Sequence, residues 1–115
     1  MPTSPLLDLS RAQEFAFEEA QLRELVETFE QSLVQEMAVI QAALAAGEAL
    51  KVEHALHALK GFMPLFAAPE LAHTMAVVYQ TSREQPLRVT EPAITALVPN
   101  LEALLGEVRA WLRPL

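Results

Sequence analysis

The long amphipathic segment over residues 18–46 is the feature that most restricts the possible folds. Its apolar side chains recur at intervals of three or four residues: Leu22, Leu25, Phe29, Leu33, Met37, Ile40 and Leu44. Such spacing places a single apolar stripe along a helix of 3.6 residues per turn. Other elements must cover that stripe, because a lone helix cannot bury it. Gly47 follows the segment as a natural helix terminator.

Four further segments carry helical patterns, and no segment shows the alternation typical of a β-strand. The predicted helices span about residues 10–17, 18–46, 49–66, 69–83 and 91–112. Connections of a few residues between long amphipathic helices favour antiparallel neighbours. We therefore expect an all-α fold, an up-down-up-down antiparallel four-helix bundle with a short additional N-terminal helix. Residues 1–115 are expected to form it as a single domain.

Capping residues and prolines suggest where the helices begin and end. Ser10 and Gln13 have the spacing of a capping box, and Thr90 is a candidate cap for the last helix. Pro64 removes a backbone hydrogen bond inside the third helix, so we expect a kink or an early end there. Pro99 should bend the last helix.

Composition narrows the classes of function. The chain is 52% hydrophobic, which argues against disorder, and it has no cysteine, which fits a reducing compartment. A net charge of −7 without a basic stripe is unfavourable for nucleic-acid binding. No signal-peptide pattern is present, and no apolar run approaches the roughly 20 residues that a membrane span needs. We expect a cytoplasmic protein without nucleic-acid or membrane partners.

The candidate chemistry lies in the predicted third helix. On a helical wheel, His57 is opposite the apolar side chains. The residues that share its face are Glu53, His54, Lys60, Gly61 and Pro64. A glycine inside a helix costs roughly 1 kcal/mol relative to alanine. One reason for Gly61 is that a partner's surface must come close to the helix beside His57.

The stretch His57-Ala-Leu-Lys60-Gly61 resembles the His-x-Leu-Lys-Gly signature of histidine-containing phosphotransfer (HPt) domains of multi-step two-component signalling. The helix end at Gly47, ten residues before His57, is similar to the turn before the active helix of that family. Leu71 stands where the family has a core leucine early in the following helix. The resemblance covers nearly the whole chain.

The resemblance implies that His57 accepts a phosphoryl group, that Lys60 neutralises its charge and that Gly61 leaves access for a receiver domain. The implied partners are response-regulator receiver domains and a hybrid sensor kinase. The chain itself would be a monomeric phosphocarrier without autokinase activity and without a cofactor. A divalent metal, expected to be magnesium, would sit in the partner receiver domain.

The residues after Gly61 depart from the family pattern, which commonly has small residues there. Phe62 and Met63 fall on the core side of the wheel, so they imply a different packing. Pro64 lies on the His57 face and would change the local docking shape. Glu53, His54 and Pro64 are thus candidates for supporting roles around His57.

Several alternatives stay open at this point. His57 could be an ordinary surface histidine on a non-catalytic helical adaptor that binds a signalling partner without carrying phosphate. Glu53, His54 and His57 could be imagined as a metal site, but they lack further ligands. Glu53 could hydrogen-bond His57 across one turn, or it could be a solvated neighbour.

The aromatic residues and the third histidine are less informative. Phe15 and Phe17 could lie in the core or beside the docking face. Tyr79 and Trp111 are interpreted as packing residues, and His73 as structural or solvated.

Overall fold

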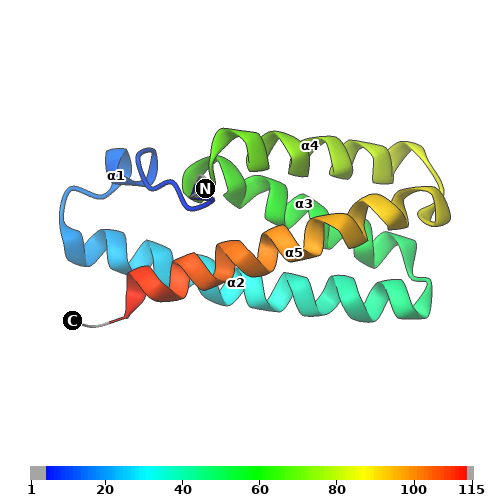
Figure 1. Cartoon of the computed structure of the whole chain (residues 1–115), viewed down its shortest axis with the longest axis horizontal. Helices are drawn as coiled ribbons and strands as arrows, with labels where there is room; N and C mark the ends of the chain where they lie inside the picture. The colour runs from blue at the N-terminus through cyan, green and yellow to red at the C-terminus, as the bar shows by residue number, and fades with distance from the viewer. Residues whose placement is uncertain (1–4, 114–115) are drawn as a thin grey trace.

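The computed structural model describes residues 5–113. It contains α1 (Ala12–Phe15), α2 (Glu19–Ala46), α3 (Ala49–Phe66), α4 (Pro69–Glu84) and α5 (Leu87–Leu112). Figure 1 shows the four long helices lying side by side, with the short α1 near the start of α2. Helix α2 packs against α3 and α5, and α4 packs against the same two helices. The all-α prediction is confirmed, and residues 1–4 and 114–115 of the expected domain lie outside the described part.

One apolar core lies between the four long helices. Phe29 of α2 is fully buried and stacks on Phe66 of α3, with ring centroids 4.4 Å apart. Phe62 tilts against the same ring at 6.0 Å. Met63 is fully buried and Phe62 is half-buried against the core, so both contribute to packing, as predicted.

The predicted inward stripe of α2 is correct except at one position. Leu22, Phe29, Leu33 and Ile40 are buried, whereas Leu25 is 38% exposed. The next residue, Val26, is fully buried in its place. Spacings of three and of four residues both fit a helical stripe, so the pattern alone does not show whether Leu25 or Val26 is the buried residue.

The capping box predicted at Ser10 is wrong. Helix α1 begins at Ala12, and Arg11 before it makes no side-chain capping bond. Ser10 instead donates to Asp8 Oδ1 from its hydroxyl at 2.6 Å and from its backbone N–H at 3.0 Å. The side-chain hydrogen bond first, and then the backbone one, lower the pKa of Asp8 below its usual value. Local hydrogen bonds of this kind compete with helix capping.

The predicted start of the last helix at about residue 91 is also wrong. Helix α5 begins at Leu87, and only Gln85 and Pro86 separate it from α4. Thr90 is therefore an interior helical residue, fully buried, whose Oγ1 donates to the carbonyl oxygen of Pro86 at 3.4 Å. Pro86 can precede a helix because its missing N–H would have no partner in the first turn.

The other predicted ends agree more closely. Gly47 ends α2 with φ of 69°, in the left-handed region where glycine carries no steric penalty. Pro64 does not end α3 early, since the helix continues to Phe66. No helix within residues 5–113 is long and apolar enough to cross a membrane.

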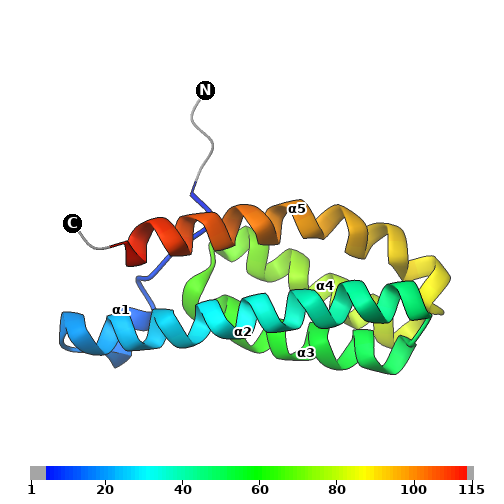
Figure 2. The ribbon, with the colours of Figure 1, turned by 90° about the horizontal axis from the view of Figure 1, so that it is seen from below.

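The segment before α1 is hydrogen-bonded to α5 and to the connection between α3 and α4. The N–H groups of Leu6 and Leu7 donate to the Glu107 carboxylate of α5 at 2.8 and 3.0 Å. Asp8 N–H donates to the carbonyl oxygen of Phe66, and Ala68 N–H donates to that of Leu6, both at 2.8 Å. Figure 2 shows this segment, in dark blue, passing α5 on its way to α1. We call residues 6–8 the N-terminal strap.

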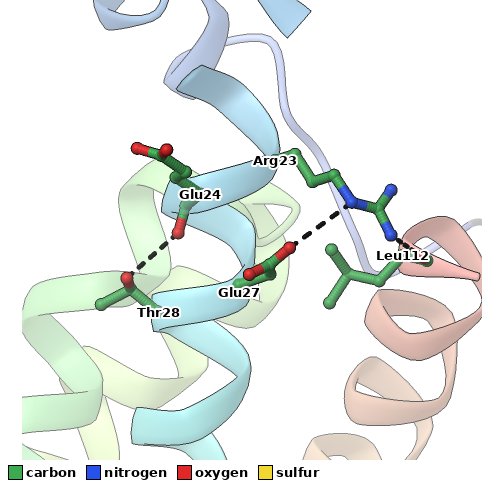
Figure 3. Close-up of polar contacts among 5 residues, drawn as sticks. All are labelled: Arg23, Glu24, Glu27, Thr28 and Leu112. Atoms are coloured by element: carbon green, nitrogen blue, oxygen red, sulfur yellow. Dashed lines mark hydrogen bonds and ion pairs between the residues drawn. The ribbon is translucent and has the colours of Figure 1, made fainter. Parts of the chain in front are cut away.

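The start of α2 is also joined to the end of α5. Arg23 donates a hydrogen bond to the carbonyl oxygen of Leu112 and pairs with Glu27 at 3.4 Å (Figure 3). Further along the same pair of helices, Arg109 Nε lies 3.0 Å from Glu30 Oε2. These contacts hold α5 along α2.

Candidate functional site

His57 lies near the middle of α3 with its side chain exposed. The opposite side of the same helix carries Val52, Leu56 and Leu59, which are all fully buried. Helical periodicity thus turns the imidazole away from the core, as the wheel predicted. An imidazole in this position is open to a second macromolecule and is held on a rigid element.

An aromatic side chain of α4, Tyr79, lies beside the imidazole of His57. The Tyr79 ring lies 5.2 Å from the His57 ring, centroid to centroid, and the two planes are inclined by 49°. Tyr79 is half-buried and packs against the core, which limits its movement. The site is therefore built at the seam between α3 and α4, and not on one helix alone.

Two cationic side chains lie over the same tyrosine ring. Lys60 Nζ is 5.1 Å from the centroid of Tyr79, and Arg83 Cζ is 5.9 Å from it. Both distances are within the range of a cation–π contact. Among residues 5–113 the ion pairs are Arg23–Glu27, Lys51–Glu48 and Arg109–Glu30, so neither Lys60 nor Arg83 is neutralised by a carboxylate.

Gly61 is exposed and leaves open space beside His57. Apart from the adjoining residues and nearby backbone of α3 itself, a Cβ atom added at Gly61 would meet no atom within 4 Å. Packing of this chain therefore gives no reason for a glycine there. The same is true of Gly106 on α5, which makes Gly106 a useful control position.

The remaining predicted site residues lie on the same face without contacting the imidazole by hydrogen bonds. Glu53 is half-buried and His54 is exposed, and within the described chain neither forms a hydrogen bond or ion pair with His57. No cluster of three or more His, Asp or Glu side chains suited to a metal ion occurs within residues 5–113. The geometry favours the interpretation of Glu53 as a solvated neighbour.

Pro64 is exposed near the end of α3, where the surface is hollowed. A cleft of about 370 Å³ opens beside it, lined also by Asp8, Arg11 and His73. The cleft lies on the continuation of the His57 face, since Pro64 and His57 share that face on the wheel. His73 is exposed, in agreement with its interpretation as a solvated residue.

Sequence reasoning missed the part of the site that α4 supplies. The interpretation of Tyr79 as a packing residue describes only its buried side, and the sequence analysis assigns no role to Arg83. The available signal was their i, i+4 spacing, which places both on one face of α4. Which neighbour that face meets depends on how α4 packs on α3.

Phe15, Phe17 and Trp111 differ in how far they are buried. Phe15 is 69% exposed and Phe17 is 92% exposed, so neither belongs to the core. Trp111 is half-buried and packs against the core, as predicted.

Comparison with known proteins places these features in context. The model of the Hpt domain family matches residues 24–111, which include His57, Lys60, Gly61, Tyr79 and Arg83. No curated protein matches the sequence. Among solved structures, histidine-containing phosphotransfer protein B (HptB) from Pseudomonas aeruginosa PAO1 superposes with a TM-score of 0.77 at 23% identity. The alignment covers 96% of each chain, so the two share the fold.

Proposed function

The chain belongs to the Hpt domain family, and from this premise we propose that His57 accepts a phosphoryl group from a receiver-domain aspartate and passes it to another receiver. Hpt domains are phosphocarrier modules of histidine phosphorelays. The observation that carries the assignment to His57 is its exposed imidazole beside a tyrosine ring that holds two cations, neither of which is ion-paired within residues 5–113.

The chemistry follows from the groups present. A neutral imidazole is a nucleophile near pH 7. One ring nitrogen of His57 attacks the phosphorus, the P–O bond of the aspartyl phosphate breaks, and the aspartate carboxylate leaves with the bonding electrons. The ring then loses its other N–H proton to water. Transfer to the second receiver runs through the same steps in reverse.

Charge neutralisation is the role we assign to Lys60. A phosphoryl group adds about −1.5 to −2 charge when carried on a hydroxyl, which serves as a guide here. Lys60 lies one helical turn after His57 and has no carboxylate partner among the described residues. Its ammonium is thus free to approach the phosphoryl oxygens. Gly61 would leave room for the receiver, with Glu53, His54 and Pro64 around the contact.

The rest of the machinery would come from the partner. Phosphoryl transfer depends mainly on positioning and on stabilising charge, and the receiver is expected to hold the divalent metal, magnesium, that assists it. The sequence has no nucleotide-binding motif, so the chain should not phosphorylate itself with ATP. The receiver of a hybrid sensor kinase is the expected donor.

We also propose the arrangement of the helices, the oligomeric state and the cellular location of the protein. Two-residue connections at positions 47–48, 67–68 and 85–86 support an up-down-up-down antiparallel bundle. The apolar core is enclosed by the helices of one chain, which supports a monomer. The sequence has no cysteine, which supports a cytoplasmic location.

Incubation with a phosphorylated receiver domain tests the proposal. Wild type should acquire an acid-labile, base-stable label, and His57→Gln should acquire none while melting at the wild-type temperature. His54→Gln is the matched control, since His54 is exposed one turn away, and it should be labelled normally. An unlabelled wild type would instead support a helical adaptor that binds a partner without carrying phosphate.

A further inference from the structure

We propose that Tyr79 and Arg83 of α4 are positioning residues of the phosphoryl site. In this view the Tyr79 ring holds Lys60 and Arg83 in place beside His57 until a phosphoryl group arrives. The inference rests on the proposed function of His57 and extends it from one helix to two.

The geometry gathers three functional groups around one ring. The His57 imidazole is 5.2 Å from the Tyr79 centroid, Lys60 Nζ is 5.1 Å from it and Arg83 Cζ is 5.9 Å from it. Tyr79 is anchored by the core, whereas Lys60 and Arg83 are exposed on long, flexible side chains. The ring is thus the fixed part and the two cations are the movable parts.

The concentration of positive charge at this ring is unusual for this chain. The sequence has only eight Lys and Arg residues against fifteen Asp and Glu, yet two of the eight lie over Tyr79. Neither Lys60 nor Arg83 takes part in an ion pair within residues 5–113. A local cationic site in an acidic protein is suited to an anion of high charge density, such as a phosphoryl group.

An aromatic ring suits this holding role better than a carboxylate does. A carboxylate at position 79 would bind both cations firmly and would also repel the incoming phosphoryl group. The face of an aromatic ring attracts cations through its quadrupole and carries no net negative charge. Charge-assisted hydrogen bonds to phosphoryl oxygens are stronger than an exposed cation–π contact, so the cations should leave the ring when His57 is phosphorylated.

Arg83 contributes something that Lys60 cannot. Its planar guanidinium can donate two parallel hydrogen bonds to phosphoryl oxygens, whereas an ammonium acts as a compact point charge. Because the ring already keeps Arg83 near the site, less side-chain freedom is lost when these bonds form. Arg83 should therefore prolong the life of the phosphorylated histidine.

A receiver-free experiment separates this role from partner docking. Phosphoramidate serves as the donor: a His57 ring nitrogen attacks its phosphorus, the P–N bond of the donor breaks, and ammonia leaves with the proton from the ring. The lifetime of the phosphohistidine is then followed by ³¹P NMR after the donor is removed. The variants are Arg83→Gln, Tyr79→Leu and the conservative Arg83→Lys and Tyr79→Phe.

We expect Arg83→Gln and Tyr79→Leu to shorten the lifetime by about two- to fivefold, the range that an exposed charge contact supplies. Tyr79→Phe should recover most of it, because it keeps the ring. Arg83→Lys should recover only part of it, because it keeps the charge but not the planar guanidinium. Added salt should shorten the wild-type lifetime and have less effect in Arg83→Gln. Arg113→Gln, an exposed arginine after the end of α5, is the matched control and should behave as wild type.

The outcomes distinguish this inference from the proposed function. Wild-type lifetimes in both Arg83→Gln and Tyr79→Leu, with His57 labelled, overturn the inference alone. Failure of His57 to take up label in every variant overturns the proposed function and the inference with it. Arg83 is exposed, so Arg83→Gln keeps the test decisive even if Tyr79→Leu fails to fold.

Discussion

The Tyr79 ring of α4 lies 5.2 Å from the imidazole of His57 on α3. Any change in how α4 packs on α3 therefore acts directly on the surroundings of the candidate phospho-acceptor. The two helices are joined by only two residues, Ala67 and Ala68, which restricts their relative movement. Substitutions at this seam should separate effects on chemistry from effects on stability.

Gly61→Gln should leave the fold intact and slow phosphoryl transfer, by up to about a hundredfold, because a small misplacement of reacting atoms is costly. A Cβ atom at position 61 faces open space and the position is exposed, so the melting temperature should equal or exceed that of wild type. Melting curves and a transfer time course from one phosphorylated receiver measure both effects. Gly106→Gln is the matched control and should transfer normally. A Gly61→Gln protein that melts far below wild type would show that Gly61 is a packing residue.

Lys60→Ala should slow transfer and shorten the phosphohistidine lifetime, with a change in the free energy of unfolding of about 0–1 kcal/mol. The reason is that Lys60 makes no ion pair among the described residues, and that the partner proposed for it, the phosphoryl group, is present only in the phosphorylated protein. Lys51→Ala is the control, since Lys51 pairs with Glu48 at 2.8 Å on the same helix. Equal transfer rates in wild type and Lys60→Ala would remove Lys60 from the site.

Glu107→Ala should lower the free energy of unfolding by about 1–3 kcal/mol without affecting phosphoryl transfer. The substitution leaves the N–H groups of Leu6 and Leu7 without their carboxylate acceptor. Urea denaturation measures the loss, and Glu102→Ala, at an exposed position of α5, is the control. A Glu107→Ala protein as stable as wild type would show that water replaces the carboxylate without cost.

Phe29→Ala should destabilise the bundle by about 3–5 kcal/mol, because it opens a cavity beside Phe62 and Phe66. Phe17→Ala, at a side chain that is 92% exposed, should change the free energy of unfolding by less than about 0.5 kcal/mol. Thermal or urea unfolding of the two variants gives the comparison. Equal effects at the two positions would contradict the assignment of the core.

Helical periodicity predicted most of the fold because it is a local property. Residue spacing within one helix decides which side of α2 and of α3 is apolar, and hence that His57 is exposed. Local signals failed where two local choices competed. Ser10 could cap α1 or bond Asp8, and Thr90 could cap a helix or lie inside one. The sequence near these residues permits both outcomes, and packing of the neighbouring helices decides between them.

The α4 half of the candidate site could not be predicted for a different reason. Tyr79 and Arg83 are separated from His57 by more than twenty residues, and their nearness depends on the rotation of α4 about its own axis. That rotation is set by the contacts of Leu71, Met75 and Val78 with the core. A single sequence shows that these three residues face inward, but it does not show which flank of α4 then meets α3.

The hydrogen bonds from the N-terminal strap to Glu107 join residues about one hundred positions apart in the chain. Such a contact has a high loop-closure cost, so it can form only after α5 has docked on the rest of the bundle. The bonds to Glu107 should accordingly be among the last to form during folding and among the first to open in native-state fluctuations. During synthesis, residues 6–8 precede Glu107 by about one hundred residues, whereas their other partners, Phe66 and Ala68, come earlier in the chain. Protection of the Leu6 and Leu7 amides from hydrogen exchange would therefore show when α5 has docked on the bundle.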